Sequence, residues 1–107
     1  MNEMINVHRI SMEAAKKNLD INKSIVLLDV RPKMEYAEGH IEGAINMPLD
    51  QLEGVVEERI SKKNQTIYLY CRSGIRTLTA GDILLNLGYT SIYDVGGIIY
   101  WPYKIVK

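Results

Sequence analysis

The chain has 107 residues, an apolar fraction of 47% and equal numbers of basic and acidic residues, 13 of each. This length suits one domain, which we expect to span residues 1–107, and this composition is sufficient for an apolar core. A formal net charge of zero argues against binding of nucleic acid or of an acidic membrane through global charge, so any anion recognition has to be local.

Apolar runs and helical periodicity alternate along the chain. The expected elements, in chain order, are a strand at 6–10, a helix at 12–19 capped by Ser11, a strand at 25–30, one helical turn at 33–38, a strand at 44–46, a helix at 49–60, a strand at 66–70, a helix at 75–87 ended by Gly88, a strand at 91–95, a turn or helix entry at Gly96 and Gly97, a last helical turn at 98–101 and a tail at 104–107. This alternation predicts an α/β fold with a central, mostly parallel sheet, helices on both faces and right-handed crossovers.

The strand expected at 25–30 is a continuous apolar run broken only by Asp29, which is typical of a central parallel strand. Asp29 and Arg31 are two positions apart, so their side chains point the same way on an extended chain. We predict that they form a structural ion pair at the strand end. His40, which lies in a connecting segment, is interpreted as a hydrogen-bonded loop anchor rather than a general base, and His8 as structural.

Cys71 is the only cysteine of the chain. This excludes an internal disulfide, an all-cysteine metal site and a resolving thiol for a thioredoxin-type cycle. The first residues lack a signal-peptide pattern, and no apolar run approaches the length of a membrane span. We therefore expect a cytoplasmic protein in which Cys71 stays a free thiol.

A lone cysteine is most often a small buried apolar side chain. Cys71, however, follows an expected strand directly, where ligand sites in open α/β sheets lie, and we expect it to be poorly placed for core filling because a polar loop follows it. Thiolates are favoured by nearby cations and helix starts, and unpaired backbone N–H groups at such starts bind anions. The loop residues expected to supply this charge and these donors are Arg72, Ser73, Gly74, Ile75 and Arg76.

Several short motifs, none of them specific by itself, occur here in a characteristic order and spacing. They are Leu28-Asp29-Val30-Arg31, Glu35-Tyr36, Gly39-His40-Ile41, Gly43-Ala44-Ile45-Asn46, Tyr70-Cys71-Arg72-Ser73-Gly74-Ile75-Arg76, Leu87-Gly88-Tyr89 and Asp94-Val95-Gly96-Gly97 with Trp101. With this combination the chain resembles the rhodanese domain of sulfurtransferases over nearly its whole length. It departs from that family at Thr77, where many members have serine, and after Trp101, where the usual Gly-x-Pro segment is missing.

The resemblance implies that Cys71 is a nucleophile. It would accept a sulfane sulfur from a donor such as thiosulfate, become a persulfide, and pass the outer sulfur to cyanide or to a thiol, including a thiol on a partner protein. Arg72 and Arg76 would attract the small anionic donor, and the loop amides would hold the sulfur. Asp29 and Arg31 would support the loop. The resemblance implies no metal and no organic cofactor.

Other functions stay open. A cysteine phosphatase needs five residues between its cysteine and the arginine that grips phosphate, whereas four separate Cys71 from Arg76. A non-catalytic binding module with the same fold is a further alternative, although such a module would be expected to lose the cysteine, glycine and arginine pair. A sulfur carrier that serves one partner is a third.

Overall fold

Five parallel strands form the centre of the fold in the computed structural model, which describes residues 6–107. Across the sheet they follow the order β1-β6-β5-β2-β4. They are β1 (His8–Arg9), β2 (Val26–Asp29), β4 (Ile45–Asn46), β5 (Ile67–Cys71) and β6 (Ile92–Gly97). A separate antiparallel pair joins β3 (His40–Ile41) to β7 (Ile105–Val106). The predicted α/β class with a mostly parallel central sheet is confirmed.

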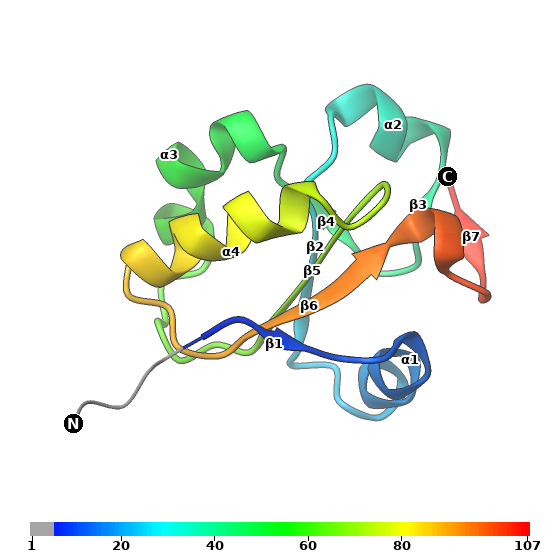
Figure 1. The fold of residues 1–107 in the computed structure, drawn as a ribbon, viewed down its shortest axis with the longest axis horizontal. Helices are drawn as coiled ribbons and strands as arrows, with labels where there is room; N and C mark the ends of the chain where they lie inside the picture. The colour runs from blue at the N-terminus through cyan, green and yellow to red at the C-terminus, as the bar shows by residue number, and fades with distance from the viewer. Residues whose placement is uncertain (1–5) are drawn as a thin grey trace.

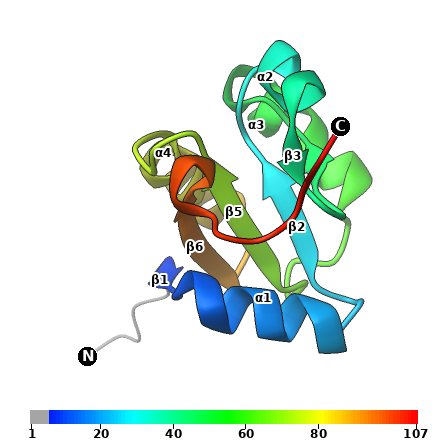
Figure 2. The same cartoon turned by 90° about the vertical axis from the view of Figure 1, so that its right-hand side faces the viewer.

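Helices cover both faces of the five-stranded sheet (Figures 1 and 2). They are α1 (Met12–Ile21), α2 (Lys33–Glu38), α3 (Leu49–Arg59) and α4 (Arg76–Asn86), followed by the 3-10 helix η1 (Ile98–Tyr100). α3 and α4 pack against each other on one face, where α4 contacts β5 and β6. α1 lies on the opposite face, and α2 lies beyond the end of β2 (Figure 2). After its last residue, β2 continues into α2, β5 continues into α4, and β6 continues into η1.

The apolar core has two layers because successive side chains of a strand point to opposite faces of the sheet. Leu28 and Leu69 belong to the layer under α3 and α4, which also contains Leu52, Val56 and Leu84. The neighbouring strand residues belong to the layer on the α1 side, which contains Ala15, Leu27, Tyr68, Tyr70 and Trp101. Burial of both faces explains why the central strands are continuous apolar runs in the sequence.

Most predicted boundaries are confirmed to within a few residues. The Ser11 hydroxyl oxygen accepts a hydrogen bond from the Ala14 N–H at 3.1 Å, as an N-cap residue does. Gly88 follows α4 with a φ of 97°, the left-handed conformation that favours glycine after a helix. Residues 1–5, on which the expectation of no signal peptide rests, lie outside the described range. Within residues 6–107, no helix combines the length and the apolar character that a membrane crossing requires.

Two predictions near the end of the chain need correction. Gly96 and Gly97, which were expected as a turn or a helix entry, are the last residues of β6, and Gly97 is also the N-cap residue of η1, so only the turn is wrong. The expected tail at 104–107 contains β7, which pairs with β3 across more than sixty intervening residues. This pairing gives the backbone of the last residues hydrogen-bond partners that a free tail would not have.

Candidate active site

Cys71 is the last residue of β5 and lies beside Gly97 of β6. The loop that follows packs directly on β6. A Cβ atom built on Gly97 would lie 2.4 Å from the Arg72 carbonyl oxygen and 2.6 Å from the Ser73 Cα, which is closer than side chains approach backbone atoms. The Ile99 N–H also donates a hydrogen bond to the Arg72 carbonyl at 3.2 Å. Glycine at the end of β6 thus allows the loop to close over the sheet.

The Cys71 side chain is buried, with 1% exposure, and belongs to the apolar layer under α3 and α4. The expectation that this residue is poorly placed for core filling is therefore wrong, because β5 extends by one more pair and keeps Cys71 on the same face as Ile67 and Leu69. The sulfur is nevertheless not surrounded by hydrocarbon alone. The Gly74 N–H points at Sγ with an N···S distance of 3.1 Å.

We expected the backbone N–H groups of Ser73, Gly74, Ile75 and Arg76 to point inward, and one of them is directed at the sulfur. The Gly74 N–H donates a hydrogen bond to Sγ. Within the described part of the chain, the N–H groups of Ser73, Ile75 and Arg76 donate no hydrogen bond. They lie between the end of β5 and the first residue of α4, where a helix has no internal acceptors for its amides. The loop therefore retains unpaired donors next to the only thiol.

Thr77 and Asp94 brace the loop from beneath. Both are almost fully buried. The Thr77 hydroxyl lies 2.8 Å from the Gly74 carbonyl oxygen and 3.0 Å from Asp94 Oδ2, and its single proton serves one acceptor at a time. Asp94 Oδ1 accepts a hydrogen bond from the Gly96 N–H at 2.9 Å. The sequence interpretation missed this brace, although a carboxylate inside the apolar run 91–95 was a usable signal.

Asp29 and Arg31 form the predicted ion pair at the end of β2. The carboxylate is fully buried, Arg31 Nη2 lies 2.7 Å from Asp29 Oδ2, and Nε lies 3.0 Å from Oδ1. The pair has a third member that was not predicted, since the Tyr70 hydroxyl donates to Asp29 Oδ2 at 2.7 Å and accepts from the Ile41 N–H. Arg31 Nη2 also donates to the Gly39 carbonyl at 2.6 Å. This network ties β2 and β5 to the segment that leads into β3.

The pKa directions in this network agree with its geometry. Burial lowers the pKa of Arg31, but the hydrogen bond and the negative charge of Asp29 outweigh burial and raise it above the usual value. Burial and the hydrogen bond to Asp29 raise the pKa of Tyr70 above its ordinary range. Tyr70 therefore stays a hydroxyl donor to a carboxylate.

The two loop arginines have different surroundings. Arg72 is exposed to solvent. Arg76, the first residue of α4, directs its guanidinium toward Glu35 of α2, with 3.6 Å between Nη2 and Oε2. The sequence interpretation treated both arginines alike, and the Glu35 contact was not foreseen. Of these two loop arginines, only Arg72 has no carboxylate within 4 Å among the described residues.

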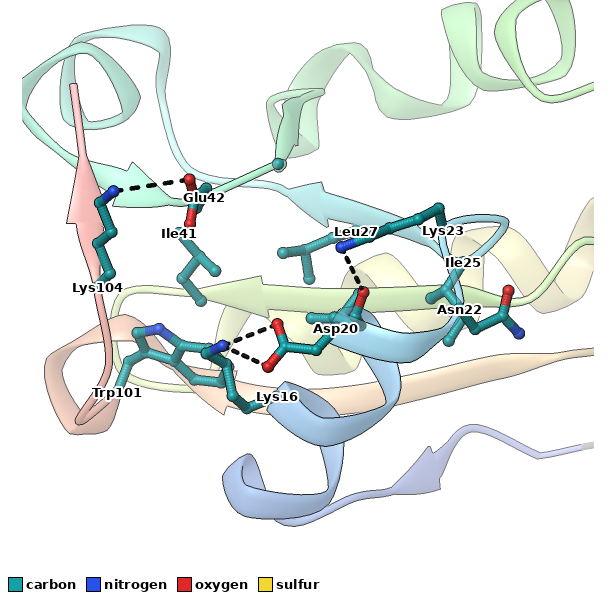
Figure 3. A pocket seen from close by; sticks show the side chains of 12 residues that line it. Lys16, Asp20, Asn22, Lys23, Ile25, Leu27, Ile41, Glu42, Trp101 and Lys104 are labelled. Carbon is teal, nitrogen blue, oxygen red and sulfur yellow. Dashed lines mark hydrogen bonds and ion pairs between the residues drawn. The ribbon is translucent and has the colours of Figure 1, made fainter.

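Two cavities border the loop. One, of about 220 Å³, is lined by Arg31, Glu35, Glu38, Gly39, Arg72, Ile98 and Ile99. The other, of about 460 Å³, is lined by Val30, Pro32, Pro48, Leu49, Asp50 and Arg76. A third cavity, shown in Figure 3, lies between α1 and the two segments that contain Ile41 and Trp101. Its lining includes charged side chains such as the ion-paired Lys16 and Asp20. It contains no residue of the Cys71 loop.

His40 takes no part in the cysteine loop. Its Nδ1 lies 2.9 Å from the Tyr36 carbonyl oxygen, and its ring stacks on the Tyr36 ring at a centroid distance of 3.7 Å. The interpretation of His40 as a loop anchor is confirmed. His8 lies in β1, at the edge of the sheet, against the Tyr93 ring.

Comparisons with known proteins agree on one family. A family model described as "Rhodanese-like domain" matches residues 11–101. The chain is 35% identical over 71 residues to "Thiosulfate sulfurtransferase PspE" of Escherichia coli, covering 66% of this chain and 68% of that protein. It is 35% identical over 91 residues to "Putative sulfur carrier protein YrkF" of Bacillus subtilis, covering 83% and 47%. The solved structure "rhodanese with anions from E. coli" superimposes with a TM-score of 0.72 and 32% identity, over 78% of this chain and 98% of that one.

Proposed function

Because the chain belongs to the rhodanese-like domain family, we propose that it is a sulfurtransferase that carries sulfane sulfur on Cys71 as a persulfide. The observation that supports this most is the loop after β5. It combines the only thiol of the chain with a bound Gly74 amide and with unpaired amides at the start of α4. Unpaired backbone donors and cationic side chains favour an anionic sulfur over a thiol.

In the first half-reaction the Cys71 thiolate attacks the outer sulfur of thiosulfate. The new S–S bond forms on Sγ, the S–S bond of the donor breaks, and sulfite leaves with the electron pair. In the second half-reaction cyanide or an acceptor thiolate attacks the outer sulfur, and Cys71 leaves again as a thiolate. A covalent intermediate of this kind divides one transfer into two displacements. Arg72 attracts the anionic donor, and the loop amides hold the negative charge on the terminal sulfur.

Sulfur loading tests the proposal directly. After incubation with thiosulfate and removal of excess donor, the intact protein should gain the mass of one sulfur atom. Dithiothreitol should remove this atom, and prior alkylation of Cys71 should prevent the gain. An unchanged mass with thiosulfate and with other sulfane donors would rule out the persulfide.

The surface around the loop supports a second candidate, a sulfur carrier whose acceptor is a thiol on a partner protein. Five large apolar side chains are exposed on the elements that border the loop, and we call them the apolar collar. They are Met34 (77% exposed), Ile75 (73%), Leu78 (61%), Ile99 (51%) and Tyr100 (66%). Large apolar side chains exposed on the elements beside a reactive group fit a protein contact better than access for a small anion.

Matched cysteine peptides separate these acceptors. A peptide with leucines beside its cysteine should accept sulfur with a lower KM than a peptide with serines in their place. Ile75→Ser should raise the KM for the leucine peptide by roughly fourfold, since one buried methylene is worth ~0.8 kcal/mol. Ile21→Ser, at an equally exposed position on α1, is the control. Equal KM values for both peptides would favour a small acceptor.

A further inference from the structure

Glu35 and Arg76 face each other where the first turn of α2 meets the first residue of α4. Their closest atoms, Glu35 Oε2 and Arg76 Nη2, are 3.6 Å apart, and about one third of each side chain is exposed. This is an ion pair without a close hydrogen bond. Within residues 6–107, Glu35 Oε1 and Arg76 Nη1 are buried and have no hydrogen-bond partner. Glu35 thus attracts the Arg76 guanidinium electrostatically, but it leaves N–H donors of the guanidinium without an acceptor.

Glu35 also faces the cavity beside the Cys71 loop. That cavity has two cationic side chains, Arg31 and Arg72, and two carboxylates, Glu35 and Glu38. Arg31 is already paired with the buried Asp29, so Glu35 and Glu38 outnumber the unpaired cation Arg72 in this wall. An anion that enters here meets the carboxylate of Glu35. Arg76, which lines the other cavity beside the loop, is held by that same carboxylate. The repulsion by Glu35, and the attraction to Arg76 that Glu35 offsets, both grow in proportion to the charge of the anion.

We propose that Glu35 sets the charge preference for the sulfur donor by holding Arg76 and by repelling strongly anionic donors. This inference rests on the proposed function. Glu35 acts through Arg76 and through its own charge, so it is a positioning and specificity-determining residue and not a catalytic one. In the wild-type protein it lowers the affinity for a dianionic donor more than the affinity for a monoanionic donor.

Two donors with different charges test this role. Thiosulfate, a dianion, leaves as sulfite, and methanethiosulfonate, a monoanion, leaves as methanesulfinate after the same attack by Cys71. Glu35→Gln keeps the shape of the side chain and removes its charge. It should lower the KM for thiosulfate by roughly two- to fivefold, as expected for a partly exposed ion pair. The KM for methanethiosulfonate should fall less, and kcat should stay the same with both donors.

Glu58→Gln is the matched control, since it removes one exposed carboxylate from α3 and should leave both KM values unchanged. Glu35→Asp keeps the charge and should retain most of the donor preference of the wild type. Equal changes for both donors, or a change in kcat alone, would reduce Glu35 to a structural residue. Wild-type protein that loads neither donor would overturn the proposed function itself. Wild-type protein that loads both, with an unchanged KM ratio in Glu35→Gln, would overturn only the role of Glu35.

Discussion

A Cys71→Ser variant is expected to take no sulfur from thiosulfate and to transfer none to cyanide above the uncatalysed background. Cys71 is the only thiol of the chain, so no other side chain can form a persulfide. A serine hydroxyl is a weak nucleophile without an adjacent general base. The one histidine near this end of the sheet, His40, is engaged with Tyr36. Thiocyanate formation and intact mass measure the loss.

The fold of this variant has to be checked, because Cys71 is buried in an apolar layer. A hydroxyl placed there with incomplete hydrogen bonding costs about 1–3 kcal/mol. Cys71→Ala avoids a buried hydroxyl and should be folded and inactive as well. Transfer by the alanine variant at the wild-type rate would show that the sulfur does not pass through Cys71, and the persulfide mechanism would have to be abandoned.

The parallel sheet and its helices could be predicted because their signals are local. The apolar runs that became β2, β5 and β6 are continuous, since helices cover both of their faces. The helix that became α4 shows repeated apolar spacing and ends before Gly88. β3 and β7 could not be predicted in the same way. Each has two residues, too few for a periodic pattern, and their pairing depends on how distant segments meet.

The position of the candidate site in the chain could be predicted, but most of the residues that surround it could not. The sequence placed Cys71 directly after a strand, whereas it is the last residue of β5. It also paired Asp29 with Arg31 from their spacing, as the structure does. The partners from other elements were missed. They are the Tyr70 hydroxyl on Asp29, Asp94 beneath Thr77, and Glu35 beside Arg76. Each of these contacts is fixed by how helices and strands pack, which spacing along one segment does not encode.

The burial of Cys71 is likewise fixed by how neighbouring strands pair and not by a local sequence pattern. A register shift between Leu69 and Tyr70 lets β5 and β6 pair as far as Cys71 and Gly97. The thiol therefore stays beneath the loop instead of lying past the strand. The sulfur is buried, and the Gly74 amide of the loop contacts it directly. We expect the donor and acceptor to reach the sulfur past this loop and its arginines.

Replacing Asp29 with alanine is expected to destabilise the protein by about 3–5 kcal/mol, because it leaves a buried guanidinium without its counter-charge. The Asp29 side chain is 0% exposed and that of Arg31 is 7% exposed. The carboxylate also accepts from the Tyr70 hydroxyl and the Arg31 N–H. All of these donors would lose their acceptor together. The midpoint of urea unfolding, with the denaturant slope fitted separately, measures the loss.

Asp20→Ala is the matched control, since it also removes one carboxylate from an ion pair. Its partner Lys16 is 35% exposed and Asp20 is 56% exposed, so the expected cost is about 0–1 kcal/mol. A similar small cost for Asp29→Ala would show that the buried network contributes little.

The activity of Asp29→Ala then shows whether Asp29 only supports the strand end or also affects binding of the donor. If Asp29 only holds the strand end, the variant at a temperature where it is folded should keep the wild-type KM for thiosulfate. A raised KM in fully folded Asp29→Ala would instead mean that the network fixes the geometry of the loop that binds the donor.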